Sequence, residues 1–176
     1  MTTPAPRLDA APPPAGHVPW QALALALVVG GSIAGTLDIL FAIAFAFANG
    51  VAPQRLLQSV ASGLLGRAAY SGGLATAVLG LGLHFLMSFA FAGAYLLASR
   101  RVPWLNGHAL LAGAAFGIGV FFFMRGVVLP LSAFPHRLSF TGLSAAMDLM
   151  SHIFLFGTPI ALAARRVMPA PQAGRQ

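Results

Sequence analysis

Four long apolar runs constrain the fold of this chain more than any other feature. They cover residues 22–48, 74–98, 108–131 and 143–164, and few charged side chains interrupt them. As helices with a rise of about 1.5 Å per residue, all four can cross about 30 Å of hydrocarbon. Because 58% of the residues are hydrophobic and only 7% are charged, we predict an all-α integral membrane protein with a bundle of four transmembrane helices.

The remaining segments predict two tails and one additional helix. Residues 1–20 are rich in proline and alanine, which predicts a disordered tail, and residues 167–176 form a second one. The transmembrane domain therefore covers residues 21–166. Between the first two spans, residues 53–69 repeat leucine and polar side chains at helical spacing, which predicts a short amphipathic helix. This helix is either a re-entrant lid that faces a substrate or a helix lying flat at the membrane interface.

The net charge of +7 comes from arginine alone, since the chain has no lysine. One group of arginines lies in the tails and in the loop after the second span: Arg7, Arg100, Arg101, Arg165, Arg166 and Arg175. The opposite side holds only Arg55, Arg67 and Arg137, so both termini are predicted to be cytoplasmic. Arginines at the ends of spans are expected to contact lipid head groups. The sequence has no basic stripe interleaved with aromatic residues, so we predict no nucleic-acid partner. The absence of cysteine excludes disulfides and thiolate metal sites.

Five charged or imidazole side chains lie deep inside the predicted spans: Asp38, His84, Arg125, Asp148 and His152. With both termini on one side, the helical rise places all of them in one layer, roughly 8 to 15 Å below the outer surface. A charged side chain costs about 2.5 to 3.5 kcal/mol at the centre of a membrane span, so these groups should face the protein interior. We therefore predict one polar cluster to which every span contributes.

Helical spacing supports this cluster, because each span carries its ionisable residues on a polar or glycine-rich stripe. The stripes contain Gly31, Gly35 and Asp38 in span one, His84, Ser88 and Tyr95 in span two, Gly113, Gly117, Phe121 and Arg125 in span three, and Ser144, Asp148 and His152 in span four. Equal depth predicts a structural ion pair between Arg125 and Asp148. Asp38, His84 and His152 then form a cluster that can respond to a ligand or to protons.

Three kinds of function are compatible with such a cluster. The first is structural or transport-accessory, with the ionisable groups fixing how the helices pack. The second is proton-coupled, cation or solute transport. The third is haem or metal binding, with His84 and His152 as axial ligands or with both joining Asp38 and Asp148 around a transition metal. The sequence favours the first, and no catalytic residue or cofactor is predicted, since the chain has no phosphate-binding loop, nucleophile elbow or dinucleotide fingerprint.

Three segments from His84 onward resemble a known family: HFLMSFAFAGAY in span two, LLAGAAFGIGVFFFMRGVVLPL in span three and MDLMSHIFLFGTPIALAARR in span four. They are similar to the YagU-like family of uncharacterised bacterial inner-membrane proteins. His84, Pro130 and His152 fall on matching positions, and Asp148 falls where the family has an acidic residue. Span one lies outside the matched half, and Arg125 departs from the pattern. The resemblance implies a small multi-span protein of the bacterial inner membrane, and helices rich in glycine and alanine favour a homo-oligomer.

Overall fold

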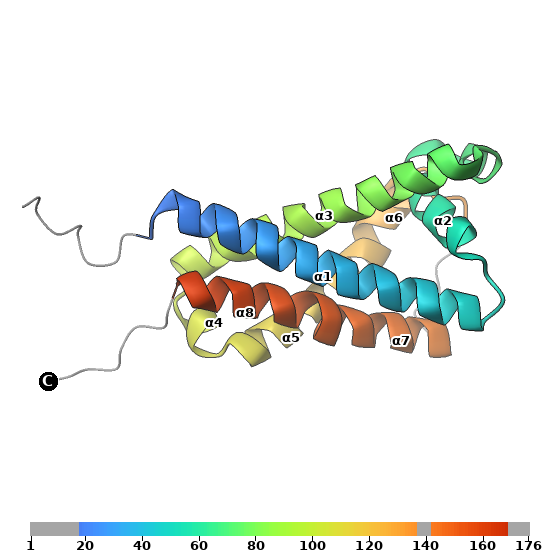
Figure 1. Ribbon diagram of the computed structural model, residues 1–176. Helices are drawn as coiled ribbons and strands as arrows, with labels where there is room; N and C mark the ends of the chain where they lie inside the picture. The colour runs from blue at the N-terminus through green and yellow to red at the C-terminus, as the bar shows by residue number, and fades with distance from the viewer. Residues whose placement is uncertain (1–17, 137–141, 169–176) are drawn as a thin grey trace, which may run out of the picture.

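The computed structural model describes residues 18–136 and 142–168. Within these ranges the chain forms helices and no strand. Four helical rods are long and apolar enough to cross a membrane, namely Trp20–Ala48, Gly73–Arg101, Ala109–Leu131 and Leu143–Val167 (Figure 1). The predicted four-span fold is confirmed, and the chain is a multi-pass membrane protein. The predicted disordered tails lie almost wholly outside the described residues.

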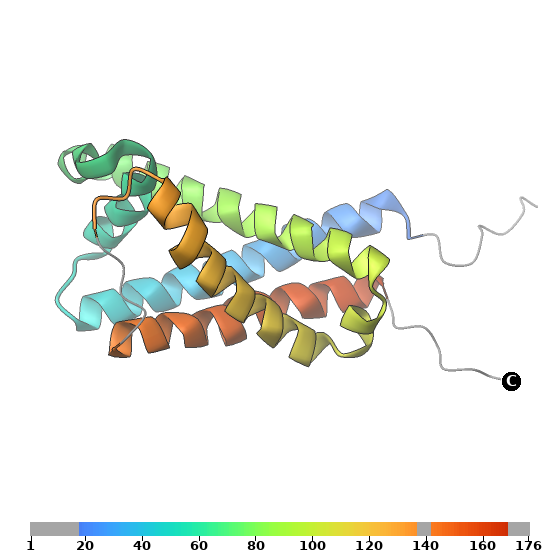
Figure 2. The same cartoon turned by 180° about the vertical axis from the view of Figure 1, so that it is seen from behind.

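Spans one and two are single continuous helices, α1 (Trp20–Ala48) and α3 (Gly73–Arg101). Between them, α2 (Pro53–Leu65) and the 3₁₀ segment η1 (Gly66–Ser71) fold back against α3. The short helix α4 (Trp104–Gly107) connects span two to span three. Figures 1 and 2 show α2 and η1 at the end of the bundle where α1 stops and α3 begins.

Spans three and four are each built from an α-helix, a π-helical segment and a second α-helix. The elements are α5 (Ala109–Phe123), η2 (Met124–Val128) and α6 (Leu129–Leu131) in span three, and α7 (Leu143–Ser151), η3 (His152–Gly157) and α8 (Thr158–Val167) in span four. Pro130 and Pro159 lie just after the two π segments. A proline has no N–H group and its ring clashes with the carbonyl four residues earlier, so a wider turn before it relieves the conflict.

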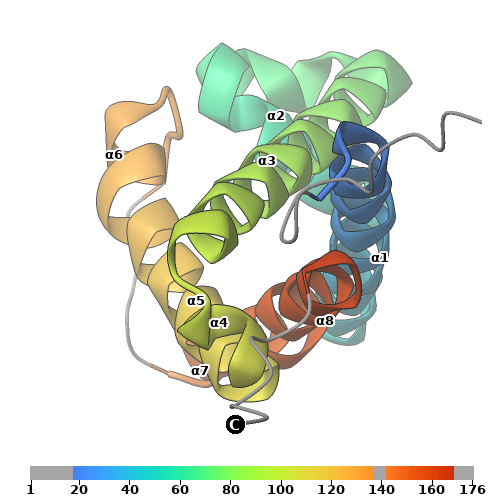
Figure 3. The ribbon, with the colours of Figure 1, turned by 90° about the vertical axis from the view of Figure 1, so that its left-hand side faces the viewer.

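The two ends of the bundle differ in composition. The start of α1 and the ends of α3 and α8 lie at one end together with α4, and Figure 3 looks along the bundle from this side. We call it the tryptophan end, because Trp20 and Trp104 lie there with exposed fractions of 72% and 51%. Exposed tryptophan is typical of a membrane–water interface. The opposite end, which we call the α2 end, contains α2 and the turn that precedes it.

Small side chains fill the contacts between helices, whereas many large apolar side chains point outward. The buried positions include Ala26, Ala34, Ala77, Ala92, Ala112, Ala161 and Ala164, and the exposed ones include Leu25, Ile33, Leu40, Val78, Leu86, Leu110 and Phe154. Lipid tails are as apolar as leucine, so helices in a membrane associate through close packing of small residues and through hydrogen bonds. The distribution of side chains therefore suits a bundle surrounded by hydrocarbon.

Helix α2 is shorter than predicted, and it buries a polar side chain. It ends at Leu65 and not at residue 69, because Gly66 adopts a φ of 59° that ends the regular helix. The side chain of Gln58 is buried and donates a 2.9 Å hydrogen bond to the carbonyl of Gly73, while Leu64 is exposed. Gln58 thus ties α2 to the start of α3, whereas the polar side chains of Gln54 and Arg55 are exposed.

Candidate functional site

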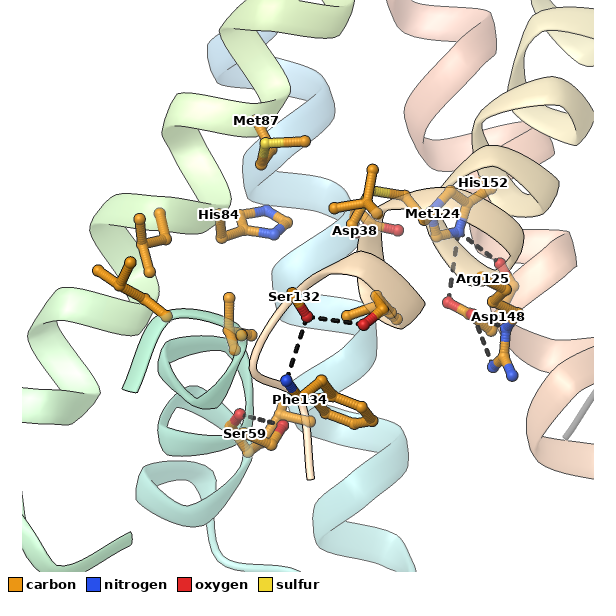
Figure 4. A pocket seen from close by; sticks show the side chains of 17 residues that line it. Asp38, Ser59, His84, Met87, Met124, Arg125, Ser132, Phe134, Asp148 and His152 are labelled. Carbon is orange, nitrogen blue, oxygen red and sulfur yellow. Dashed lines mark hydrogen bonds and ion pairs between the residues drawn. The ribbon is translucent and has the colours of Figure 1, made fainter. Parts of the chain in front are cut away.

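A cavity of about 550 Å³ lies in the α2 half of the bundle, and all the ionisable residues of the predicted cluster line it (Figure 4). Asp38 comes from α1, His84 from α3, Arg125 from η2, Asp148 from α7 and His152 from the start of η3. The remaining walls are mostly apolar and come from α2, α3 and span three. They include Leu56, Val60, Leu64, Leu83, Met87, Met124 and Val128. The cavity therefore combines a group of ionisable side chains with apolar walls.

Arg125 and Asp148 lie within ion-pair distance across spans three and four. The Nε and Nη2 atoms of Arg125 are 3.1 and 2.9 Å from the same carboxylate oxygen, Oδ2 of Asp148. The guanidinium carbon also stands 4.9 Å from the centroid of the Phe121 ring. The Arg125 side chain is 15% exposed and that of Asp148 is 38% exposed. The guanidinium charge is therefore held by a carboxylate in a partly buried position.

The other oxygen of Asp148 faces His152, one helical turn further along. His152 Nδ1 lies 3.3 Å from Asp148 Oδ1 and donates a 2.8 Å hydrogen bond to the backbone carbonyl of Asp148. Because a carbonyl oxygen can only accept, Nδ1 carries the proton, and Nε2 is an acceptor in the neutral ring. The carboxylate of Asp148 is therefore engaged by neighbours on both of its oxygens.

The carboxylate of Asp38 has a different environment. Its Oδ1 atom accepts a 2.6 Å hydrogen bond from the hydroxyl of Ser151, which is itself buried. Across residues 18–136 and 142–168, no arginine or histidine nitrogen lies within ion-pair distance of Asp38. An ionised carboxylate offers about four lone-pair sites to hydrogen-bond donors. The carboxylate of Asp38 therefore lines the cavity with lone pairs to which none of the described residues donates.

His84 is fixed by the glycine stripe of span one. Its Nε2 atom donates a 2.8 Å hydrogen bond to the carbonyl of Gly35, and one turn along, Ser88 donates a 2.7 Å hydrogen bond to the carbonyl of Gly31. The missing side chains of the two glycines let α3 approach α1 closely enough for these bonds. Since Nε2 is the donor, Nδ1 of a neutral His84 is an acceptor.

Asp38, His84 and His152 line one cavity but do not bond to one another within the part of the chain that the structure describes. Each is held by its own partner. In the same described part, no three His, Asp or Glu side chains lie close enough together to hold a metal ion. The structure therefore does not bring the candidate metal ligands Asp38, His84, Asp148 and His152 into one coordination site. Haem binding through His84 and His152 stays a prediction.

Two features of the site were not predicted from the sequence. Ser151 is the hydrogen-bond partner of Asp38, although it looked like an ordinary small residue beside His152. The π segments η2 and η3 contain Arg125 and His152 respectively. Single π turns in helices occur frequently at functional sites. The signal that could have indicated them was the position of Pro130 and Pro159 soon after these two residues.

The fold and the cavity together define a class: a multi-pass membrane protein with ionisable groups around an amphiphilic cavity inside its helical bundle. Comparison with family models, with curated proteins and with solved structures finds no match for this chain. The resemblance to the YagU-like family therefore stays a prediction. The site itself is the basis on which a function can be assigned.

Proposed function

We propose that this chain is a transport-accessory protein of a bacterial inner membrane that binds a small solute in its cavity. The observation that supports this is a cavity that is lined by side chains from all four spans. In this proposal Arg125 and Asp148 lock spans three and four together, while Asp38, His84 and His152 respond to the solute. Both termini face the cytoplasm, so the cavity lies in the outer half of the membrane.

A purely structural role for the cluster accounts for the geometry less well. Ionisable groups that serve packing alone are expected to satisfy one another in a closed hydrogen-bond network. Arg125 and Asp148 meet this expectation, but Asp38 has a single donor among the described residues and borders open space. The volume of about 550 Å³ also falls within the usual range of small-molecule sites, about 300 to 1,000 Å³.

Cysteine labelling tests whether a solute can reach the cavity. The chain has no cysteine of its own, so Met87→Cys in the cavity wall provides a single reactive position. The thiolate is the reactive form of cysteine, and it forms where water reaches the thiol but not where lipid surrounds it. We expect iodoacetamide, which is small, neutral and soluble in water, to modify Met87→Cys in native membranes.

Leu86→Cys is the matched control. Leu86 neighbours Met87 on α3 but is 62% exposed on the outer surface of the bundle. In contact with lipid its thiol remains protonated, so we expect labelling at least about tenfold slower than at Met87→Cys. Equal rates at the two positions, or no reaction at Met87→Cys, would contradict a solute-accessible cavity.

A further inference from the structure

We infer that the solute is an amphiphilic organic cation, with an ammonium group at Asp38 and an apolar part against α2, α3 and span three. The inference rests on the proposed solute site and names the chemical class of its ligand. Three properties of the cavity lead to it: the charge that remains on its wall, the kind of hydrogen-bonding groups beside that charge, and the apolar surface around them.

One negative charge on the cavity wall has no ion-pair partner among the described residues. Arg125 and Asp148 neutralise each other at 2.9 Å. His84 and His152 each donate a ring proton to a backbone carbonyl, and Nδ1 of His152 also lies 3.3 Å from the carboxylate of Asp148, so neither ring is paired with Asp38. Asp38 remains as a carboxylate without an ion-pair partner among the described residues. A carboxylate in hydrocarbon is costly unless a cation pairs with it, and a cationic ligand would provide that partner.

The two imidazole rings beside Asp38 each offer an acceptor nitrogen in their neutral form. In Figure 4, the rings of His84 and His152 lie on opposite sides of Asp38. With one nitrogen of each ring donating to a carbonyl, the second nitrogen of each neutral ring is an acceptor. An ammonium group carries only donors, so it suits a carboxylate between two such rings. An anion would instead meet carboxylates and an arginine that is already held by Asp148.

The rest of the cavity is suited to an apolar substituent. Leu56, Val60, Leu83 and Val128 contribute aliphatic walls, and Met87 adds a flexible side chain that adapts to ligands of different shape. A bare inorganic cation would leave these walls unused. It would also lack a coordination shell, since no three candidate ligand side chains lie together in the described residues. An ammonium group on an apolar body uses both parts of the cavity.

Three matched probes test the inference: 4-phenylbutylammonium, 4-phenylbutanol and 4-phenylbutyrate, which differ only in the charge and chemistry of the head group. Each is added to Met87→Cys protein in vesicles of zwitterionic lipid, and protection from iodoacetamide is measured against concentration. We expect the ammonium compound to protect at a concentration at least about tenfold lower than the alcohol, as a charge-assisted hydrogen bond implies. The butyrate should give no protection.

Asp38→Asn in the Met87→Cys background identifies the group that recognises the charge. Asparagine keeps an oxygen that can accept from Ser151, so the helix contact is preserved while the charge is lost. We expect the preference for the ammonium compound over the alcohol to fall from about tenfold or more to near unity. Ser59→Ala is the control, because it removes a cavity hydroxyl that donates to the carbonyl of Leu56 and carries no charge. It should leave the preference unchanged.

Several outcomes would overturn the inference. Equal protection by the alcohol, stronger protection by the butyrate, or a preference that survives Asp38→Asn would each show that the site does not select a cation through Asp38. Absence of protection by all three probes would also refute it. The proposed function is judged separately, by the difference in labelling between Met87→Cys and Leu86→Cys without any probe.

Discussion

The hydroxyl of Ser151 donates a 2.6 Å hydrogen bond to the carboxylate of Asp38, and this bond joins α1 to α7 across 113 positions of sequence. The next residue, His152, contacts the other membrane-embedded acid, Asp148. Two consecutive residues of span four thus hold both carboxylates of the cavity. A change at either position is expected to affect packing between spans as well as the cavity.

Ser151→Ala tests the contribution of this bond to stability. The substitution leaves Asp38 without its donor among the described residues, so the free energy of unfolding should fall by about 1 to 3 kcal/mol. The measurement is reversible denaturation in mixed micelles. Ser144→Ala, at an exposed position of the same helix, should change stability by less than about 0.5 kcal/mol. Equal effects of the two substitutions would show that the bond contributes little.

The ion pair between Arg125 and Asp148 can be tested by a double-mutant cycle. Arg125→Gln and Asp148→Asn each remove one charge of the pair. Because Asp148 is 38% exposed, each should cost about 1 to 3 kcal/mol, less than the about 3 to 5 kcal/mol typical of a fully buried pair. The double variant should be more stable than the sum of the single effects implies, with a coupling of about 1 kcal/mol. Additive effects would contradict a structural role for the pair.

The four-span fold and the ionisable residues that line the cavity could be predicted from the sequence, because both depend on short-range regularities. Apolar runs of sufficient length specify the spans, and the helical rise places Asp38 and His152 at similar depth. The partner of Asp38 could not be predicted in this way. Depth and periodicity indicate which layer a side chain occupies, but they do not indicate whether Ser151 or His84 reaches the carboxylate.

The orientation of α2 shows a second limit of sequence analysis. The leucines of residues 53–69 indicate an amphipathic helix but do not indicate which face contacts the protein. In water the apolar face would be buried, whereas in the structure Gln58 is buried and Leu64 is exposed. In apolar surroundings, hydrogen bonds between helices stabilise their association, and polar side chains are then buried between them. The burial of Gln58 therefore follows from its hydrogen bond to Gly73 and not from the apolar pattern of the helix.

Close packing between α5 and η3 predicts that substitution to alanine destabilises the protein at Gly117 but not at Gly119. A methyl group at Gly117 would overlap the backbone of His152, whereas one at Gly119 would meet open space. Gly117→Ala should therefore lower the unfolding free energy by about 1 to 3 kcal/mol through overpacking. Gly119→Ala should raise it by about 0.5 to 1 kcal/mol, because alanine is the better helix former. Thermal denaturation in detergent compares the two, and a similar loss at both positions would contradict the close contact.

The orientation in the membrane follows from the arginines and can be measured by labelling from one side. The described arginines at the tryptophan end are Arg100, Arg101, Arg165 and Arg166, and those at the α2 end are Arg55 and Arg67. Since arginine is enriched on the cytoplasmic side, we expect the α2 end to face outward. Asn49→Cys and His108→Cys replace exposed residues at the α2 and tryptophan ends without changing any arginine.

A membrane-impermeant maleimide added to intact spheroplasts distinguishes the two orientations. Asn49→Cys should react at once, because it lies at the end of α1 on the proposed outer side. His108→Cys should react only after the membrane is opened, and the cysteine-free parent chain should not react at all. The reverse pattern would place the cavity in the cytoplasmic half of the membrane. In that case the solute would have to reach Asp38 from inside the cell.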